Sequence, residues 1–230
     1  MWAYSKKLQF PVTVKNNNVI KNLKMAKCLI TQYGGSNGEL AAALRYLNQR
    51  YTMPDNRGRS LLTDIGTEEL AHVEIISTMI TKLMKGATVE QIKAAGLESN
   101  YAEHNLALYP TDSNGVPFTV KYFATTGDFL ADISEDMAAE EKARAVYENL
   151  IDLAEDDDII NILLWLRQRE IVHFSRFKEL YDYYKEKYGR NSWEWECKKL
   201  CVKLPNYGNK DNGDWDFNLF YVILMESVNR

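Results

Sequence analysis

Apolar residues recur at alternating intervals of three and four along most of the chain between positions 19 and 188, as in a helix with one buried face. This pattern predicts a helix over residues 19–33 and, after the glycine-rich stretch GGSNG, a continuation over residues 39–51. Further helices are predicted over residues 61–85, 129–153 and 159–188. Pro54 and Gly58 predict a loop before the second helix, Gly86 predicts its end, and Asp158 is expected to cap the fourth.

The segment between residues 87 and 127 joins the second and third helices, and it is longer than antiparallel neighbours need. It has helical character only over residues 89–95 and then carries Pro110, Gly115 and Pro117. Such a connection is typical of a bundle with one crossover. The sequence therefore predicts an all-α fold, a four-helix bundle over residues 19–188 with a long crossover between helices two and three. Residues 1–18 are expected to form an N-terminal arm and residues 189–230 a C-terminal extension.

Ionisable residues interrupt the apolar stripe of three predicted helices. The stripes consist of Ile65, Glu69, His72, Ile76 and Met79, of Ile133, Met137, Glu140, Arg144 and Tyr147, and of Leu166, Glu170, His173, Phe177 and Leu180. Buried carboxylates are costly unless a positive charge compensates for them. Arg144 could supply one such charge, and a pair of divalent cations would supply four.

The motif Glu-x-x-His occurs twice, at Glu69/His72 and at Glu170/His173. Residues three apart share one helix face, so both side chains of a motif can reach one metal. Two such motifs, with one Glu from each of two other helices, form the di-metal pattern of ferritin-like bundles. Glu39 and Glu140 fill those two places. Oxygen and imidazole donors suit manganese, iron or zinc, and the absence of sulfur argues against copper(I) and iron–sulfur clusters.

Other polar residues are assigned more modest roles. Tyr46 lies two turns after Glu39 and either donates a hydrogen bond to a ligand carboxylate or packs in the core. His104 is expected to be a surface or structural residue of the connection, and Cys197 and Cys201 to be packing residues. Three glutamates fall off the apolar stripes and are expected to be solvated, namely Glu68, Glu74 and Glu141.

Composition narrows the function classes. The 230 residues carry 28 basic and 32 acidic side chains, a net charge of −4 with no basic stretch, which excludes a nucleic-acid partner. No apolar run is long enough for a membrane span, and no secretory signal is apparent at the start. Three cysteines fit a reducing compartment, so we expect a cytoplasmic protein whose later destination is reached by assembly.

Four segments together resemble the manganese catalases, and especially the manganese-catalase-like coat proteins of bacterial endospores. The segments are GGSNGELAAALRYLNQRY, LLTDIGTEELAHVEII, ISEDMAAEEKARAVYENLIDLAEDDD and LRQREIVHFSRF. The resemblance covers about residues 1–185 and includes the interval of 33 residues between Glu140 and His173. It implies a ferritin-like bundle that binds two manganese ions per subunit, disproportionates hydrogen peroxide to water and dioxygen, and assembles as a homohexamer.

The resemblance also implies a role for each candidate residue. Glu69 would bridge the two ions, with Glu39 and His72 completing one site. Glu140 and His173 would complete the other site. The implied catalytic residues outside the metals are Glu170, as proton acceptor and donor, and Tyr46.

Two further hypotheses stay open on the sequence alone. A di-iron oxidase on the same bundle would bind two iron ions and use Glu170 as a sixth ligand. A structural component of the spore coat would retain the site only as a vestige and interact with other coat proteins.

Overall fold

The computed structural model describes residues 19–188, and within this range α-helices dominate. The elements are α1 (Val19–Gly34), α2 (Glu39–Gln49), the 3-10 turn η2 (Arg50–Thr52), α3 (Asn56–Met84), α4 (Val89–Ala95), α5 (Glu98–His104), the 3-10 turn η3 (Val120–Phe123), α6 (Phe129–Leu153) and α7 (Asp157–Tyr188). The described residues contain an isolated bridge between Thr111 and Pro117 but no β-strand. The predicted all-α class is confirmed.

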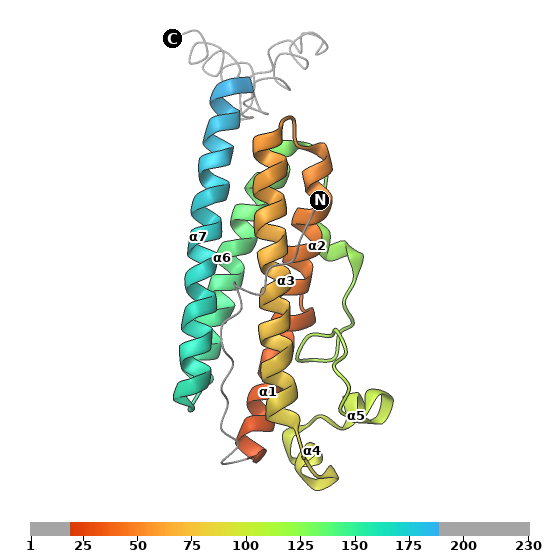
Figure 1. Cartoon of the computed structure of the whole chain (residues 1–230). Coiled ribbons are helices and arrows are strands. Elements are labelled where there is room, and N and C mark those ends of the chain that lie inside the picture. Colours follow the sequence, from red (N-terminus) through yellow and green to blue (C-terminus); the bar gives the residue numbers. More distant parts are fainter. Residues whose placement is uncertain (1–18, 189–230) are drawn as a thin grey trace, which may run out of the picture. The chain divides into compact units, whose positions relative to one another are not determined.

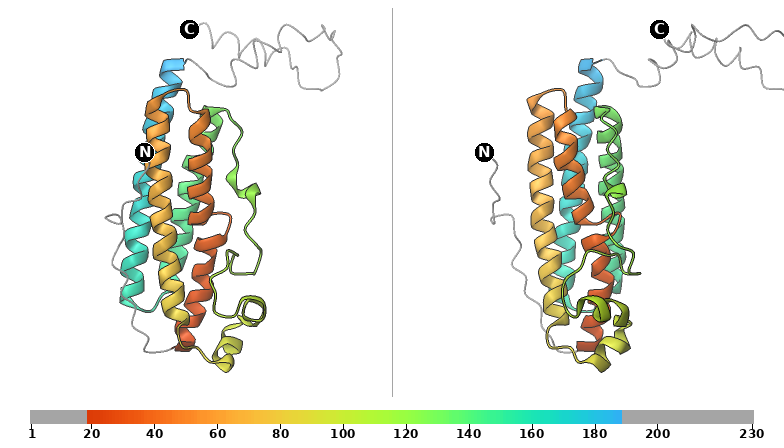
Figure 2. Two further views of the ribbon diagram at one scale, coloured as in Figure 1. Left: turned by 45° about the vertical axis from the view of Figure 1, so that its right-hand side comes forward. Right: turned by 90° about the vertical axis from the view of Figure 1, so that its right-hand side faces the viewer.

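Four columns of helix make up the bundle (Figure 1). α1 and α2 follow one another along a single column, and α3, α6 and α7 are the other three (Figure 2). α3 and α6 run in one direction, whereas α2 and α7 run in the other. α2 and α7 each pack on both α3 and α6, so the columns close around a common interior. This arrangement is the predicted four-helix bundle.

The crossover between α3 and α6 returns along the outside of α1 and α2 (Figure 2). The guanidinium of Arg45 on α2 holds it by donating to the backbone carbonyls of Tyr122, at 2.7 Å, and Phe123, at 3.0 Å. Gly34, at the end of α1, is needed where the crossover passes, because a Cβ there would lie 2.6 Å from the backbone of Thr111. The crossover is therefore fastened to the first column. α5 within it was not predicted.

The helix starts differ from the sequence expectation in two places. α3 begins at Asn56, five residues before the predicted start, because Asp55 caps it by accepting from the backbone N–H of Gly58. Gly58 is therefore helical, and a Cβ at this position would collide with the hydroxyl of Tyr184. The cap of α7 is Asp156 and not Asp158, since the Asp156 carboxylate accepts from the N–H of Asp158 at 2.9 Å.

The apolar core of the described residues consists of two clusters. One contains Leu29, Ile76, Leu150 and Leu166, and the other contains Leu62, Ile133, Phe177 and Leu180. Between the two clusters along the helix lie Glu68, Glu69 and His72 on α3, Asp136 and Glu140 on α6, and Glu170 and His173 on α7. The fold thus places a polar layer between two apolar ones.

Several expectations lie outside the described residues. These are the N-terminal arm over residues 1–18, the C-terminal extension over residues 189–230, and the packing roles of Cys197 and Cys201. Among the helices that the structure describes, none combines the length and apolar character needed to cross a lipid bilayer.

Candidate metal centre

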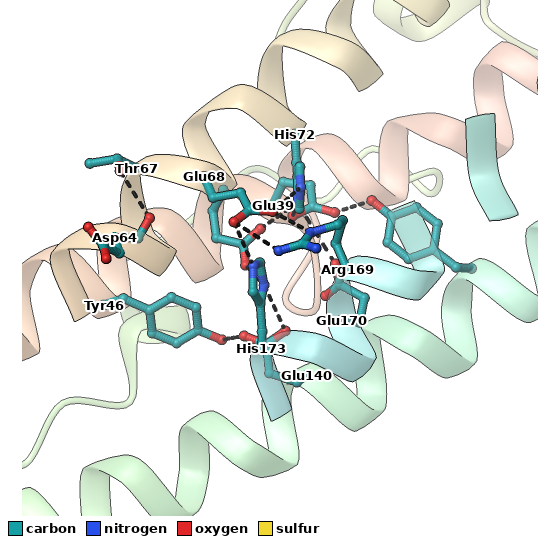
Figure 3. A network of polar contacts seen from close by, with 12 residues as sticks. Glu39, Tyr46, Asp64, Thr67, Glu68, His72, Glu140, Arg169, Glu170 and His173 are labelled. Atoms are coloured by element: carbon teal, nitrogen blue, oxygen red, sulfur yellow. Dashed lines mark hydrogen bonds and ion pairs between the residues drawn. The ribbon is translucent and has the colours of Figure 1, made fainter. Parts of the chain in front are cut away.

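Figure 3 shows His72 of α3 and His173 of α7 close together, and Glu69 of α3 faces both of them. Its Oε2 lies 2.8 Å from Nδ1 of His72, and its Oε1 lies 2.7 Å from Nδ1 of His173 on α7. The carboxylate thus directs one oxygen toward each imidazole. A carboxylate that bridges two metal ions needs this orientation, in which each oxygen serves a different ion.

Three further carboxylates complete the cluster. Glu39 Oε2 is 3.5 Å from Nδ1 of His72, and Glu140 Oε2 is 3.6 Å from Nδ1 of His173. Glu170 Oε1 is 3.8 Å from Nδ1 of His72. All six side chains are at most 2% exposed. The structure therefore brings together every metal-binding residue predicted from the sequence, with Glu170 beside them.

These donors form two overlapping groups in which one ligand atom per residue lies within 4.8 Å of the others. The first group contains Glu39, Glu69, His72 and Glu170, and the second contains Glu69, Glu140, Glu170 and His173. Glu69 and Glu170 belong to both. Each group can hold one ion, and together they suit a pair of divalent metals with oxygen and nitrogen ligands.

The hydrogen bonding of the cluster fits such a pair. Among the described residues, Glu69 Oε1, Glu140 Oε2, Glu170 Oε1 and His173 Nδ1 are buried atoms without a partner of hydrogen-bond geometry. Buried polar atoms are nearly always satisfied, and unsatisfied ones that converge on one place indicate a missing ion or water. Four such atoms from α3, α6 and α7 converge here. The residues present therefore fit a dimetal centre.

Without metal, protons compensate for the buried negative charge. Burial, reinforced by the charge of Glu69, raises the pKa of Glu39 to about 8. Burial also raises the pKa of Glu170 well above its usual value, and the charges of Glu39 and Glu69 add to this effect. Burial opposes ionisation of Glu69 as well, but His173 and His72 outweigh it and hold the pKa of Glu69 below its usual range. A metal would replace these protons.

A tyrosine supports each of the two outer carboxylates. The hydroxyl of Tyr46 on α2 donates to Glu140 Oε1 at 2.5 Å, which confirms the hydrogen-bonding interpretation of Tyr46. The hydroxyl of Tyr147 on α6 donates to Glu39 Oε1 in the same way. The sequence interpretation placed Tyr147 on the buried stripe but missed its hydroxyl. In both cases the second carboxylate oxygen remains free to face the centre.

Two expectations about charge are wrong. Glu68 is buried, not solvated, and its carboxylate pairs with Arg169 of α7, with Oε1 2.5 Å from Nε. Arg144 does not compensate for the centre, because it lies at the surface in ion pairs with Glu141 and Glu148. The buried face of α6 consequently carries Asp136 and Ala143 in place of the predicted Met137 and Arg144. The sequence does contain a signal for this pair. Glu68 directly precedes one Glu-x-x-His motif and Arg169 directly precedes the other, and the two residues have opposite charges.

Glu74, expected to be solvated, is half-buried, whereas the expectations for Glu141 and His104 hold. Glu141 is largely exposed, at 46% of its side chain. His104 is the last residue of α5, and its ring stacks on Tyr109 with the ring centroids 3.7 Å apart. It belongs to neither group of candidate metal donors in the described range.

Comparison with known proteins decides the family. A sequence profile for manganese-containing catalase matches residues 1–190. The chain belongs to the manganese catalase family. Within this family it is 56% identical to Protein CotJC of Bacillus subtilis over 186 residues, which cover 81% of this chain and 96% of that protein.

The relatives that are named as manganese catalases are less similar to the chain. The chain is 33% identical to a probable manganese catalase of Clostridium acetobutylicum over 179 residues, which cover 78% of this chain and 79% of the relative. The crystal structure of KatB, a manganese catalase from Anabaena, superimposes with a TM-score of 0.71 at 28% identity. The match covers 93% of this chain and 88% of KatB. The fold predicted from the family resemblance is thereby confirmed.

Proposed function

We propose that this member of the manganese catalase family disproportionates two molecules of hydrogen peroxide to two molecules of water and one of dioxygen at a pair of manganese ions. The supporting observation is the position of Glu69, whose two oxygens face Nδ1 of His72 and Nδ1 of His173 at 2.8 and 2.7 Å. When bound, the two ions would supply two-electron redox chemistry by cycling between the divalent and trivalent states.

Each side chain of the cluster has a separate part in this proposal. Glu69 would bridge the two ions, while Glu39 and His72 would bind one of them. Glu140 and His173 would bind the other. The hydroxyls of Tyr46 and Tyr147 each occupy one oxygen of Glu140 and Glu39, which orients the second oxygen toward the metals.

Glu170 would act as the proton acceptor and donor for peroxide. Its carboxyl group is buried beside both groups of donors, and burial favours its protonated form. A carboxyl group that exchanges a proton within hydrogen-bond distance of substrate serves as a general acid and base. Tyr46 would assist by holding Glu140 fixed during the exchange.

The decisive experiment is oxygen evolution from peroxide by protein loaded with Mn²⁺, expressed per pair of bound ions. Turnover that rises with manganese content and disappears in Glu69→Ala would support the proposal. The exchange Glu148→Gln provides a matched control, because Glu148 is a surface residue whose carboxylate pairs with arginines. Full manganese loading without oxygen evolution would refute the catalase function and favour a vestigial site.

One observation favours a second candidate, a di-iron oxidase. Glu170 offers a ligand atom to both donor groups, and a di-iron site would use four carboxylates and two imidazoles. Protein produced with both metals supplied would distinguish the two candidates. We expect two manganese ions per chain, and two iron ions with oxygen consumption would instead identify the oxidase.

We further propose a hexamer that is made in the cytoplasm and assembled into the spore coat with other coat proteins. The support is the resemblance to the coat members of the family and the 56% identity to CotJC. Light scattering should give six times the chain mass, and a monomer at micromolar concentration would contradict this. When expressed in sporulating Bacillus subtilis without CotJC, the chain should appear in the coat extract of purified spores and not only in the cytoplasm.

A further inference from the structure

Glu68 lies beside both imidazoles of the candidate centre, His72 and His173 (Figure 3). Its Oε2 is 3.3 Å from Nε2 of His173, and its Oε1 is 3.7 Å from Nε2 of His72. The Nδ1 atoms of both rings point the other way, toward the candidate ligand carboxylates. One carboxylate therefore faces the outer nitrogen of each histidine.

Arg169 fixes the position of this carboxylate. Its Nε and Nη2 donate to the two oxygens of Glu68 at 2.5 and 3.3 Å, so the guanidinium fork contacts both. Arg169 directly precedes Glu170 on α7, and Glu68 directly precedes Glu69 on α3. The pair thus joins the two helices that carry the Glu-x-x-His motifs.

Stability alone does not account for this pair. Buried ion pairs contribute little net stability, because both charges lose their hydration. The Nε2 atoms of His72 and His173 are both buried and have no partner of hydrogen-bond geometry among the described residues, and the Glu68 carboxylate faces both of them. A neutral imidazole that offers Nδ1 to a metal carries its proton on Nε2, and this proton needs an acceptor.

We propose that Glu68 is a positioning residue shared by the two metal sites. It accepts the Nε2 protons of His72 and His173, one on each oxygen, and so keeps both Nδ1 atoms free and directed at the metals. Metal-binding histidines usually have such an acceptor, and its loss weakens metal binding about 10–100-fold. Here one carboxylate serves two histidines, so its loss should weaken both sites together. This inference rests on the proposed dimetal function.

Glu68→Gln is the informative change. Glutamine keeps the length of the side chain but has a single acceptor oxygen, and its amide nitrogen would face either an Nε2 proton or Arg169. The matched control is Glu148→Gln, because Glu148 also pairs with an arginine of α7, Arg167 at 3.2 Å, but at the surface. The two exchanges remove the same charge and the same kind of cross-helix ion pair.

Metal-free wild-type protein and both variants would be titrated with Mn²⁺ by calorimetry, and bound manganese per chain would be measured after dialysis. We expect Glu68→Gln to bind both ions about 10–100-fold more weakly than wild type. The control should bind both with wild-type affinity. The melting temperature of the metal-free proteins reports any loss of folding separately.

Each alternative result has a distinct meaning. If Glu68→Gln retains one ion at wild-type affinity, the shared role is refuted, and if it retains both, Glu68 does not position the histidines. If this variant does not fold, Arg169→Gln replaces it, since Arg169 is 25% exposed and its exchange leaves Glu68 in place. Unchanged affinity for both ions in that variant would also overturn the inference. Wild-type protein that binds no manganese would instead refute the metal centre itself.

Discussion

Replacing Glu69 by alanine removes the carboxylate that faces both imidazoles of the centre. The change leaves His72 and His173 without their nearest acceptor, at 2.8 and 2.7 Å, and it deletes the bridge between the two donor groups. Neither ion would then have a complete set of ligands. We expect the variant to contain no manganese after dialysis, whereas wild-type protein should contain two ions per chain.

The effect on stability follows from linkage. An ion that binds only the folded chain stabilises it by about 2.7 kcal/mol when its free concentration is 100 times Kd. Two ions under that condition contribute about 5 kcal/mol. For a chain of this size, 1 kcal/mol corresponds to about 2–4 °C in melting temperature. Manganese should therefore raise the melting temperature of wild-type protein by about 10–20 °C and leave that of Glu69→Ala unchanged.

The assay compares melting with Mn²⁺ and with a chelator, for wild type, Glu69→Ala and the surface control Glu148→Gln. The difference in melting temperature between the two conditions reports the effect of the metal alone. This comparison is needed because alanine also leaves a cavity that lowers the stability of the metal-free protein. In Glu148→Gln, Mn²⁺ should raise the melting temperature by as much as in wild type. A Glu69→Ala protein that keeps both ions and the full increment would refute the assignment of Glu69 as the bridge.

Two further changes test the surroundings of the centre, and a third tests the cap of α3. Glu170→Gln should keep both manganese ions and lose most peroxide turnover, and loss of one ion would instead make Glu170 a ligand. Tyr46→Phe removes a 2.5 Å hydrogen bond to a buried carboxylate and should lower stability by about 1.5–3 kcal/mol in urea unfolding, and unchanged stability would contradict the role of this bond. Burial opposes ionisation of Asp55, but hydrogen bonds from Tyr184, Lys187 and Gly58 lower its pKa to about 2. Ionised Asp55 therefore stabilises the fold above pH 4, and this stabilisation is lost toward pH 2. Asp55→Asn should lower the free energy of unfolding by about 1 kcal/mol at pH 7, and by progressively less as the pH falls from 4. A cost that does not change with pH would refute this reasoning.

The helices were predictable where local sequence determines them. α6 has the predicted bounds, because Asp128 provides a cap that accepts from the N–H groups of Leu130 and Ala131, and buried positions then recur at helical spacing as far as Leu150. The start of α3 was not predictable in this way. Pro54 and Gly58 are typical of a loop, but Gly58 lies in the helix that Asp55 caps, and a glycine is needed there because the hydroxyl of Tyr184, distant in sequence, occupies the space that a Cβ would fill.

The same distinction applies to the candidate centre. Glu69/His72 and Glu170/His173 could be found because a repeated motif on an apolar stripe is visible within a single helix. The burial of Glu68 could not be found from α3 alone, since its partner Arg169 lies 101 residues further along the chain. Solvation is the usual expectation for such a glutamate. Contacts between helices determine whether such a glutamate is buried, and a single sequence does not show which residues of different helices are in contact.

The crossover divides the donors into two equal halves. The column of α1 and α2, together with α3, carries Glu39, Glu69 and His72, and the pair of α6 and α7 carries Glu140, Glu170 and His173. Each half therefore holds two carboxylates and one imidazole, but neither holds a complete centre. A chain cut within the crossover would yield two fragments whose reassociation metal ions promote, because the ion held by Glu140 and His173 would also need Glu69 of the other fragment. During biosynthesis, uptake of the ion bound by Glu140 and His173 would accordingly follow, and not precede, the docking of the second half onto the first.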